Sequence, residues 1–269
     1  MADDEEHHPD TGQGRGEARA PHDVHLLQRE HTPEAVRRRL ARPNGGSHLR
    51  DFVYGAIDGT VTTFAVVSGV AGARLSATVV VILGVANLVA DGFSMAVSNF
   101  LGSRAEEQQQ ARARREEQRH LDLVPEGERE EIRQIFAAKG FRGEQLERTV
   151  EVITGDRRVW LDTMMTEELG YAQRSSNPVR AAATTFVAFV AVGSLPLLVF
   201  LYDLAFTVEV AHPFAWSAGM TAVGFFAVGA LKSRFVDQRW WTAGLETLAV
   251  GAVAAGLAFA LGAALQGVA

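Results

Sequence analysis

Five long apolar stretches constrain the fold of this chain more than any other feature. They cover residues 52–73, 76–101, 179–202, 213–231 and 243–266. Each reaches the ~20 residues that a helix rising ~1.5 Å per residue needs to cross a hydrocarbon layer of about 30 Å. The sequence therefore predicts an all-α membrane protein with five transmembrane helices.

Charged and polar residues gather in two other segments. The chain is 47% apolar with a net charge of -6, but these averages conceal the segregation. We expect four segments along the chain: a disordered cytosolic tail rich in His and Arg (1–48), transmembrane helices 1 and 2 (49–103), a cytosolic helical metal-binding domain (104–174), and transmembrane helices 3 to 5 (175–269).

Basic residues near the span ends indicate the orientation. Several arginines precede the first span, Arg174 and Arg180 precede the third, and more basic residues follow the fourth. The loop between the first two spans has only Arg74, and "YDLAFTVEVAHP" between the third and fourth has no Lys or Arg. This asymmetry predicts that the N-terminus and the 104–174 segment are cytosolic.

Two of the spans carry polar residues along one helix face. On the first span Asp51, Asp58 and Thr62 are spaced by seven and four residues, so they share a face. The second span has a sharper stripe, whose members recur every four residues: Asn87, Asp91, Met95 and Asn99. Lipid cannot hydrogen-bond these groups, so the stripes should face protein or a water-filled path.

Two facing stripes would form a polar channel. Helix packing explains Asn87 and Asn99 equally well. For Asp58 and Asp91 a function is favoured, because an intramembrane charge costs at least ~2.5 kcal/mol at the helix centre. Met95 is one turn from Asp91 and is a candidate soft ligand. The predicted transport pathway contains these acids and the thioether: Asp51, Asp58, Asp91 and Met95.

The 104–174 segment is predicted to be helical. "SRAEEQQQARARREEQRHLD" has no Gly or Pro, so it should continue the second span as one long helix until Pro125. A second helix should end at Gly140, and a third should be broken near Gly155. A charged helical domain of this kind is often only a solvated structural element.

Side-chain spacing argues for a metal site instead. Three pairs each lie on one helix face: Glu117 with His120, Glu128 with Glu131, and Met164 with Glu168. Helices that meet would bring carboxylates, an imidazole and a thioether together. The chain has no cysteine, which excludes thiolate ligands. An oxygen-rich set with one nitrogen and one sulfur suits Fe²⁺ or Mn²⁺ better than Ca²⁺.

Several motifs resemble those of the vacuolar iron transporter family. They are "DGTVTTFAVVSGVAGA", "NLVADGFSMAVSNFLGSRAE", "REEQRHLDLVPEGEREEIRQIFAAKGF" and "LDTMMTEELG", and the resemblance runs from about Leu49 to the C-terminus. It implies a homodimer of five-helix subunits in a lipid bilayer. Such a dimer moves Fe²⁺, and often Mn²⁺, out of the cytosol in exchange for protons, through a pore between the subunits.

The resemblance also assigns residues. The pore acid matches Asp58, the pore methionine Met95, and an acid at the cytosolic mouth Asp51. The metal ligands of the cytosolic domain match four glutamates and two methionines: Glu117, Glu128, Glu131, Glu168, Met164 and Met165. His120 stands where the family usually has a glutamate, which removes a negative charge and adds a group that titrates near neutrality.

A transporter of this kind is no enzyme and needs neither a prosthetic group nor a nucleic acid. Two alternatives remain, a membrane-anchored ferroxidase and a metal-sensing protein, and both would use the Glu, His and Met cluster. Neither explains why acids are held inside the membrane, which favours transport. No targeting segment is evident, so we expect the plasma (inner) membrane.

The N-terminal tail contains six of the eight histidines. It would suit a metal-collecting arm, but the spacing of its histidines is irregular. We favour a disordered tail with a short helix over "TPEAVRRRLAR", whose arginines would lie on anionic headgroups.

Overall fold

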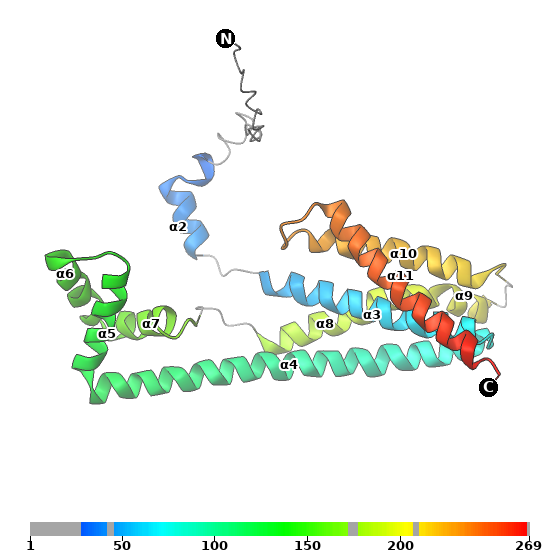
Figure 1. Ribbon diagram of the computed structural model, residues 1–269, viewed down its shortest axis with the longest axis horizontal. Coiled ribbons are helices and arrows are strands. Elements are labelled where there is room, and N and C mark those ends of the chain that lie inside the picture. Colours follow the sequence, from blue (N-terminus) through cyan, green and yellow to red (C-terminus); the bar gives the residue numbers. More distant parts are fainter. Residues whose placement is uncertain (1–27, 42–45, 172–176, 207–209, 268–269) are drawn as a thin grey trace, which may run out of the picture. The chain divides into compact units, whose positions relative to one another are not determined.

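The computed structural model describes residues 28–41, 46–171, 177–206 and 210–267, and within these residues it has helices and no β-strand (Figure 1). The helices are, in chain order, α2 (Pro33–Ala41), α3 (Gly46–Gly72), α4 (Ala77–Leu123), α5 (Pro125–Ala138), α6 (Gly143–Thr154), α7 (Arg157–Glu167), α8 (Pro178–Gly193), the 3-10 turn η1 (Leu195–Leu197), α9 (Leu198–Phe206), α10 (Pro213–Lys232) and α11 (Trp240–Leu265). The all-α prediction is confirmed for this part of the chain.

Five helical segments are long and apolar enough to cross a membrane. They are His48–Gly72, Ala77–Leu123, Pro178–Phe206, Pro213–Lys232 and Trp240–Leu265. Each segment overlaps one of the five predicted stretches, so that prediction is confirmed by length and composition. The second segment is longer than a bilayer requires, because α4 continues without a break from its apolar half into its charged half.

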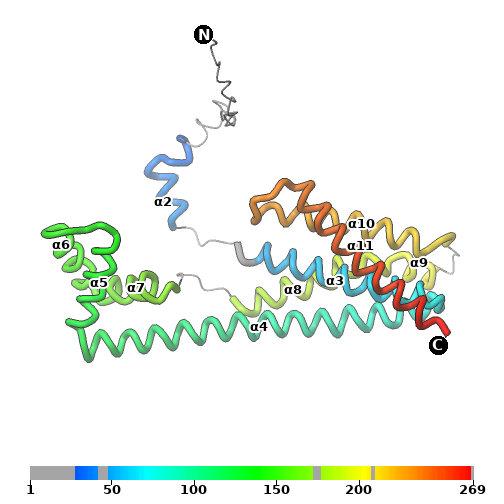
Figure 2. The backbone as a smooth tube through the Cα atoms, viewed as in Figure 1, coloured from blue at the N-terminus to red at the C-terminus, as the bar shows by residue number. Residues whose placement is uncertain are grey.

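Helix α3 is the most buried of the five spans and packs against α4, α8, α10 and α11 (Figure 2). Its contact with α8 depends on glycine. A Cβ at Gly55 would lie 2.5 Å from the carbonyl oxygen of Thr185, and Gly59 meets the backbone of Phe189 in the same way. The small residues therefore let the two helix backbones touch, as the Gly55-x-x-x-Gly59 spacing predicts.

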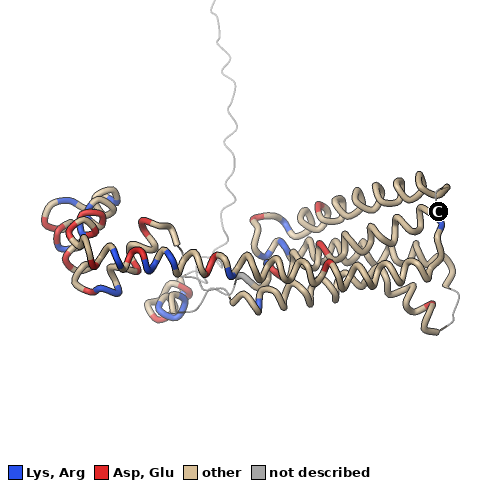
Figure 3. Tube along the Cα trace, turned by 90° about the horizontal axis from the view of Figure 1, so that it is seen from below, with Lys and Arg blue, Asp and Glu red and all other residues tan. Residues whose placement is uncertain are grey.

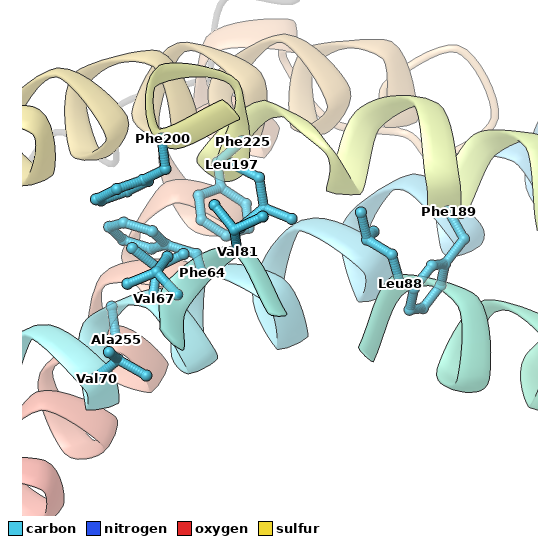
Figure 4. Close-up of a cluster of buried hydrophobic side chains, with 11 residues drawn as sticks. Phe64, Val67, Val70, Val81, Leu88, Phe189, Leu197, Phe200, Phe225 and Ala255 are labelled. Carbon is cyan, nitrogen blue, oxygen red and sulfur yellow. The ribbon is translucent and has the colours of Figure 1, made fainter. Parts of the chain in front are cut away.

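Aromatic and branched side chains fill the space around α3. Figure 4 shows the buried cluster, in which Phe64 and Val67 of α3 lie near Phe200 and Phe225 from the later spans. Phe189 of α8 is completely buried in the same cluster. This apolar core fixes the positions of α3, α4 and α8, and with them the two polar stripes.

The third span is broken, which the sequence reading of one continuous stretch missed. α8 ends at Gly193, and Pro196 lies in the short turn η1 before α9 begins. Proline has no N–H to donate to the helix ladder and its ring clashes with the preceding turn. Ser217 of α10 donates to the carbonyl oxygen of Pro196 over 2.6 Å, so this buried carbonyl keeps a partner.

The charged half of α4 leads into α5, α6 and α7, and Figure 3 shows how the acidic and basic residues concentrate there. Pro125 begins α5 immediately after α4 ends. Gly140 follows α5 with a φ of 101°, a value that favours glycine. Gly155 ends α6, and Asp156 caps α7 by accepting from the backbone N–H groups of Arg158 and Val159. The predicted helix ends at Pro125, Gly140 and Gly155 are confirmed.

The chain divides into two units between Asn44 and Gly45, so α2 is described by itself. It confirms the short helix predicted over "TPEAVRRRLAR". Most of the predicted disordered tail lies outside the described residues, and the four predicted domain boundaries stay predictions.

Candidate functional site

The two predicted polar stripes face one another across α3 and α4. The loop that joins these helices is short, so they run antiparallel, and two cross-helix hydrogen bonds fix their register. The side chain of Asn87 donates to the hydroxyl of Thr62 over 3.4 Å, and that of Asn99 donates to Asp51 Oδ1 over 3.4 Å. Residue numbers across each bond sum to about 150, so both pairs belong to one antiparallel register.

Asp58 and Asp91 lie between these two hydrogen-bonded pairs, as the same register requires. Their carboxylates interact electrostatically across the contact between α3 and α4. Both residues are on the exposed surface of the single chain, while Asp51 is only 6% exposed. The register of α3 and α4 therefore places Asp58 and Asp91 at mid-span on the outside of the subunit and Asp51 inside it.

Met95 occupies a different environment. It is partly buried and packs against the apolar cluster of the membrane bundle. It is one turn along α4 from Asp91, as its spacing predicts, but its contacts in the single chain are with apolar side chains.

A second group of acids lies where α4, α5 and the end of α7 meet. Glu117 and Glu128 are 4% and 3% exposed, whereas Glu131 and Glu168 are on the surface. The Nδ1 atom of His120 is 3.5 Å from Glu128 Oε1 and 4.0 Å from Glu117 Oε2. Three helix segments thus bring five of the predicted ligands into one cluster.

Two ion pairs hold α7 against α4 beside this cluster. Arg114 contacts Asp162 over 2.7 Å, and Arg157 contacts Asp122 over 2.6 Å. They place the C-terminal end of α7 near α5, where the carboxyl groups of Glu168 and Glu131 are in hydrogen-bonding contact.

Three of the clustered acids have raised pKa values. Burial, contact with the Glu128 carboxyl group and the charges of Glu168 and Glu131 raise the pKa of Glu117 to about 8. Burial, followed by neighbouring carboxylates, also raises the pKa values of Glu131 and Glu168. Uncompensated negative charge in a partly dry site is the condition that a divalent cation relieves.

The oxygen atoms themselves fit a cation. Glu117 Oε1 and Glu128 Oε2 are buried and have no hydrogen-bond donor among the described residues. A buried carboxylate oxygen without a partner is costly, and a metal ion supplies the missing positive charge. Among the described residues, no three His, Asp or Glu side chains form a group that could hold a metal ion as they stand.

The two methionines are part of the core beneath the acids. Met164 is completely buried and Met165 is 4% exposed, and both pack with Leu121, Ile132 and Trp160 in the apolar cluster of this region. Because both side chains are buried, packing in the apolar core is enough to explain methionine at these positions. That their sulfur atoms bind a metal stays a prediction.

Comparison with known proteins decides the family. The model of the VIT family matches residues 49–263. The chain is 32% identical over 225 residues to "Vacuolar iron transporter 1" of Arabidopsis thaliana, covering 82% of this chain and 87% of that protein. It is 31% identical over 225 residues to "Vacuolar iron transporter" of Plasmodium berghei (strain Anka), covering 81% of this chain and 82% of that protein.

The chain belongs to the VIT family.

Membership in the VIT family confirms the resemblance seen in the motifs. The matched relatives are named as transporters and the VIT family is not a family of enzymes, in agreement with the prediction. All predicted site residues lie within the matched range of 49–263, although the match does not assign their roles. The relatives are named for the vacuole, so they give no support to the predicted plasma membrane.

The sequence reading missed one contact beside the predicted transport pathway. Asn99 donates a 2.8 Å hydrogen bond to the hydroxyl of Thr185 on α8, in addition to its contact with Asp51. The only signal in the sequence is a pair of threonines in an otherwise apolar span, "AAATTFVAFV". Nothing in that pattern indicates which span they face.

Proposed function

We propose that this protein is a homodimeric transporter that moves Fe²⁺, and also Mn²⁺, out of the cytosol in exchange for protons. Family membership supports the transport of a metal ion, because the curated relatives are named iron transporters. The ions, the exchange and the dimer rest on the arrangement of side chains within the chain.

The observation that carries the proposal is the placement of Asp58 opposite Asp91 in the membrane-spanning part of α3 and α4. Two carboxylates at this depth carry the charge that a divalent cation needs, and lipid offers them no hydrogen bonds. A carboxylate can hold a metal ion or a proton but not both at the same oxygen, so the two ions compete for it. This competition is the physical basis of exchange.

The cluster around Glu117 and Glu128 would act before the pathway. Its clustered negative charge would raise the local concentration of divalent cations on the cytosolic side. Glu131, Glu168 and His120 complete an oxygen-rich set with one nitrogen, which suits Fe²⁺ and Mn²⁺. The thioethers of Met164 and Met165 would contribute only if the apolar core opens toward the acids.

The exposed position of the mid-span acids supports a dimer. Asp58 and Asp91 lie on the surface of the single chain beside apolar α4 residues that are also exposed, such as Val89 and Phe93. An acid facing lipid would be costly. A second copy placed on this face would cover the apolar residues and enclose the acids and Met95 between the subunits.

Transport by purified protein in liposomes tests the proposal. A divalent-metal dye and a pH dye would report the two fluxes with Fe²⁺ and Mn²⁺ in turn. We expect metal movement coupled to opposite proton movement in the wild type and loss of both in Asp58→Asn. Glu246→Gln is the matched control, because Glu246 is an acid of the fifth span that is paired with Lys232 over 3.3 Å.

Each alternative predicts a different result. Metal binding without flux would overturn the transport proposal and leave a sensor, and oxidation of Fe²⁺ by the protein would indicate a ferroxidase. Normal flux in Asp58→Asn would remove Asp58 from the pathway. Which membrane holds the protein is a separate question. Fractionation of cells that express the tagged protein would distinguish the predicted plasma membrane from the vacuole named in the relatives.

A further inference from the structure

Asn99 lies at the centre of a polar network where three spans meet. One N–H of its side-chain amide contacts Asp51 of α3 over 3.4 Å, and its other contact is the 2.8 Å bond to Thr185 of α8. Its amide oxygen accepts from Ser103 of α4 over 3.4 Å. Both N–H groups of the amide therefore donate a hydrogen bond, and its oxygen accepts one.

The neighbours fix which way the amide points. The hydroxyl of Thr185 donates to the carbonyl of Ala181 in its own helix over 3.0 Å, so toward Asn99 it can act only as an acceptor. A carboxylate is also an acceptor. The NH₂ end must consequently face Thr185 and Asp51, and a flipped amide would lose these bonds.

The backbone around the network is rigid. Thr185 is 1% exposed, and its carbonyl is at the site where Gly55 lets α3 and α8 touch, one turn from Asp51. The short bond to Thr185 thus ties Asn99 to a place where the backbones of α3 and α8 touch. The contact to Asp51 is longer, at 3.4 Å, and it joins the Asp51 carboxylate to the same amide.

We propose that Asn99 is a positioning residue for Asp51, and that Thr185 and Ser103 orient the Asn99 amide so that the Asp51 carboxylate is held ready for a divalent cation. This inference rests on the proposed function, together with the prediction from the family resemblance that Asp51 is the acid at the cytosolic mouth. Asn99 does not itself hold the ion. It acts through Asp51 of α3, and it lies one turn after Met95 on α4.

Transport kinetics of the full protein in liposomes, with Mn²⁺ as the probe, test the inference. In Asn99→Leu the amide is replaced by an apolar group of similar size, and we expect the apparent KM for Mn²⁺ to rise roughly tenfold with a smaller change in maximal rate, because a hydrogen bond to a charged group is lost at the residue that captures the ion. Thr185→Val should shift KM in the same direction by a smaller factor.

Thr221→Val is the matched control. Thr221 is also completely buried and donates to the carbonyl four residues earlier in its helix, over 2.7 Å, but among the described residues it accepts no hydrogen bond from another span. Its KM should be that of the wild type. If both threonine variants raise KM equally, the effect is one of general packing and the inference is wrong.

The exchanged pair Asp51→Asn with Asn99→Asp separates positioning from stability. It restores an amide next to a carboxylate, and the carboxylate on α4 can accept from Thr185 once that hydroxyl turns away from Ala181. Its thermal unfolding should therefore recover in part relative to Asn99→Leu, whereas KM should stay high because the carboxylate now belongs to α4. A wild-type KM in the exchanged pair, or an unchanged KM with a lower unfolding temperature in Asn99→Leu, would overturn the inference. A wild type that moves no metal would instead overturn the proposed function and this inference together.

Discussion

The carboxyl groups of Glu117 on α4 and Glu128 on α5 are in contact, and each keeps one buried oxygen without a donor among the described residues when both are ionised. If Glu117 is protonated, it can donate to Glu128 and the conflict disappears. Its pKa of about 8 means that this protonated form dominates at pH 7 in the metal-free protein. A metal ion that binds here must therefore displace a proton.

Proton release on metal binding is the first prediction. Calorimetric titration of the detergent-solubilised protein with Mn²⁺, in two buffers of different ionisation enthalpy, should show about one proton released per ion at pH 7. Release should fall toward zero above pH 9, and affinity should rise from pH 6 to pH 8 as Glu117 loses its proton. Glu117→Gln should bind Mn²⁺ more weakly and release less. A binding enthalpy that is the same in both buffers at pH 7 would contradict this prediction.

The second prediction concerns stability without metal. Because the pKa of Glu117 is raised in the folded protein to about 8, the folded state binds this proton more tightly than the unfolded state. Stability is therefore highest below the unfolded pKa of about 4.5 and falls as the pH rises to about 8. Glutamine carries no charge at any pH, so Glu117→Gln should unfold at a higher temperature than the wild type, with a gap that widens from pH 5 to pH 8.

Thermal unfolding followed by fluorescence in the presence of a chelator measures this gap. Glu130→Gln is the control with the opposite sign, because hydrogen bonds from Gln134 and Arg133 lower the pKa of Glu130 at an exposed position. It should leave the unfolding temperature unchanged or slightly lower. A gap between Glu117→Gln and the wild type that does not change with pH would show that Glu117 ionises freely in the folded protein.

The spans and the facing stripes were predictable because they depend on short-range rules. Apolar length defines the spans, and the brief loop around Arg74 makes the first two helices antiparallel neighbours. Once they are neighbours, a repeat of four residues places Asp91 opposite Asp58. In the same way, the spacings of Glu117 with His120 and of Glu128 with Glu131 indicate their helix faces.

Contacts between distant segments were not predictable in this way. The bond from Asn99 to Thr185 depends on how α8 packs on α3, and the apolar pattern of α8 does not specify which face turns inward. The break at Pro196 was signalled by the proline, but the hydroxyl of Ser217 that supports it lies in another span. The burial of Met164 likewise follows from the packing of α7, which the spacing to Glu168 does not reveal.

The third prediction concerns the side of the membrane on which each loop lies. The chain has no cysteine, so a single introduced cysteine is a unique label. Glu126 near the start of α5 and Ala211 before α10 are both exposed. In right-side-out spheroplasts of a bacterial host, an impermeant maleimide should label Ala211→Cys directly and Glu126→Cys only after lysis. Labelling of both before lysis, or of neither, would contradict the predicted orientation with a cytosolic 104–174 segment.

The fourth prediction concerns the backbone contact between α3 and α8 at Gly55. In Gly55→Ala the added Cβ would meet the backbone of Thr185 at 2.5 Å, and a backbone cannot give way as a flexible side chain can. Because α3 and α8 must separate, we expect a loss of about 1–3 kcal/mol of stability, measured as reduced survival of the folded protein in size-exclusion chromatography after heating.

Gly219→Ala is the matched control, since a Cβ on this α10 glycine meets nothing within 4 Å. It should be neutral or slightly stabilising, because alanine favours the helix. Equal survival of the two variants would mean that α3 and α8 do not depend on this glycine, and the rigid support inferred for Asn99 would lose its basis.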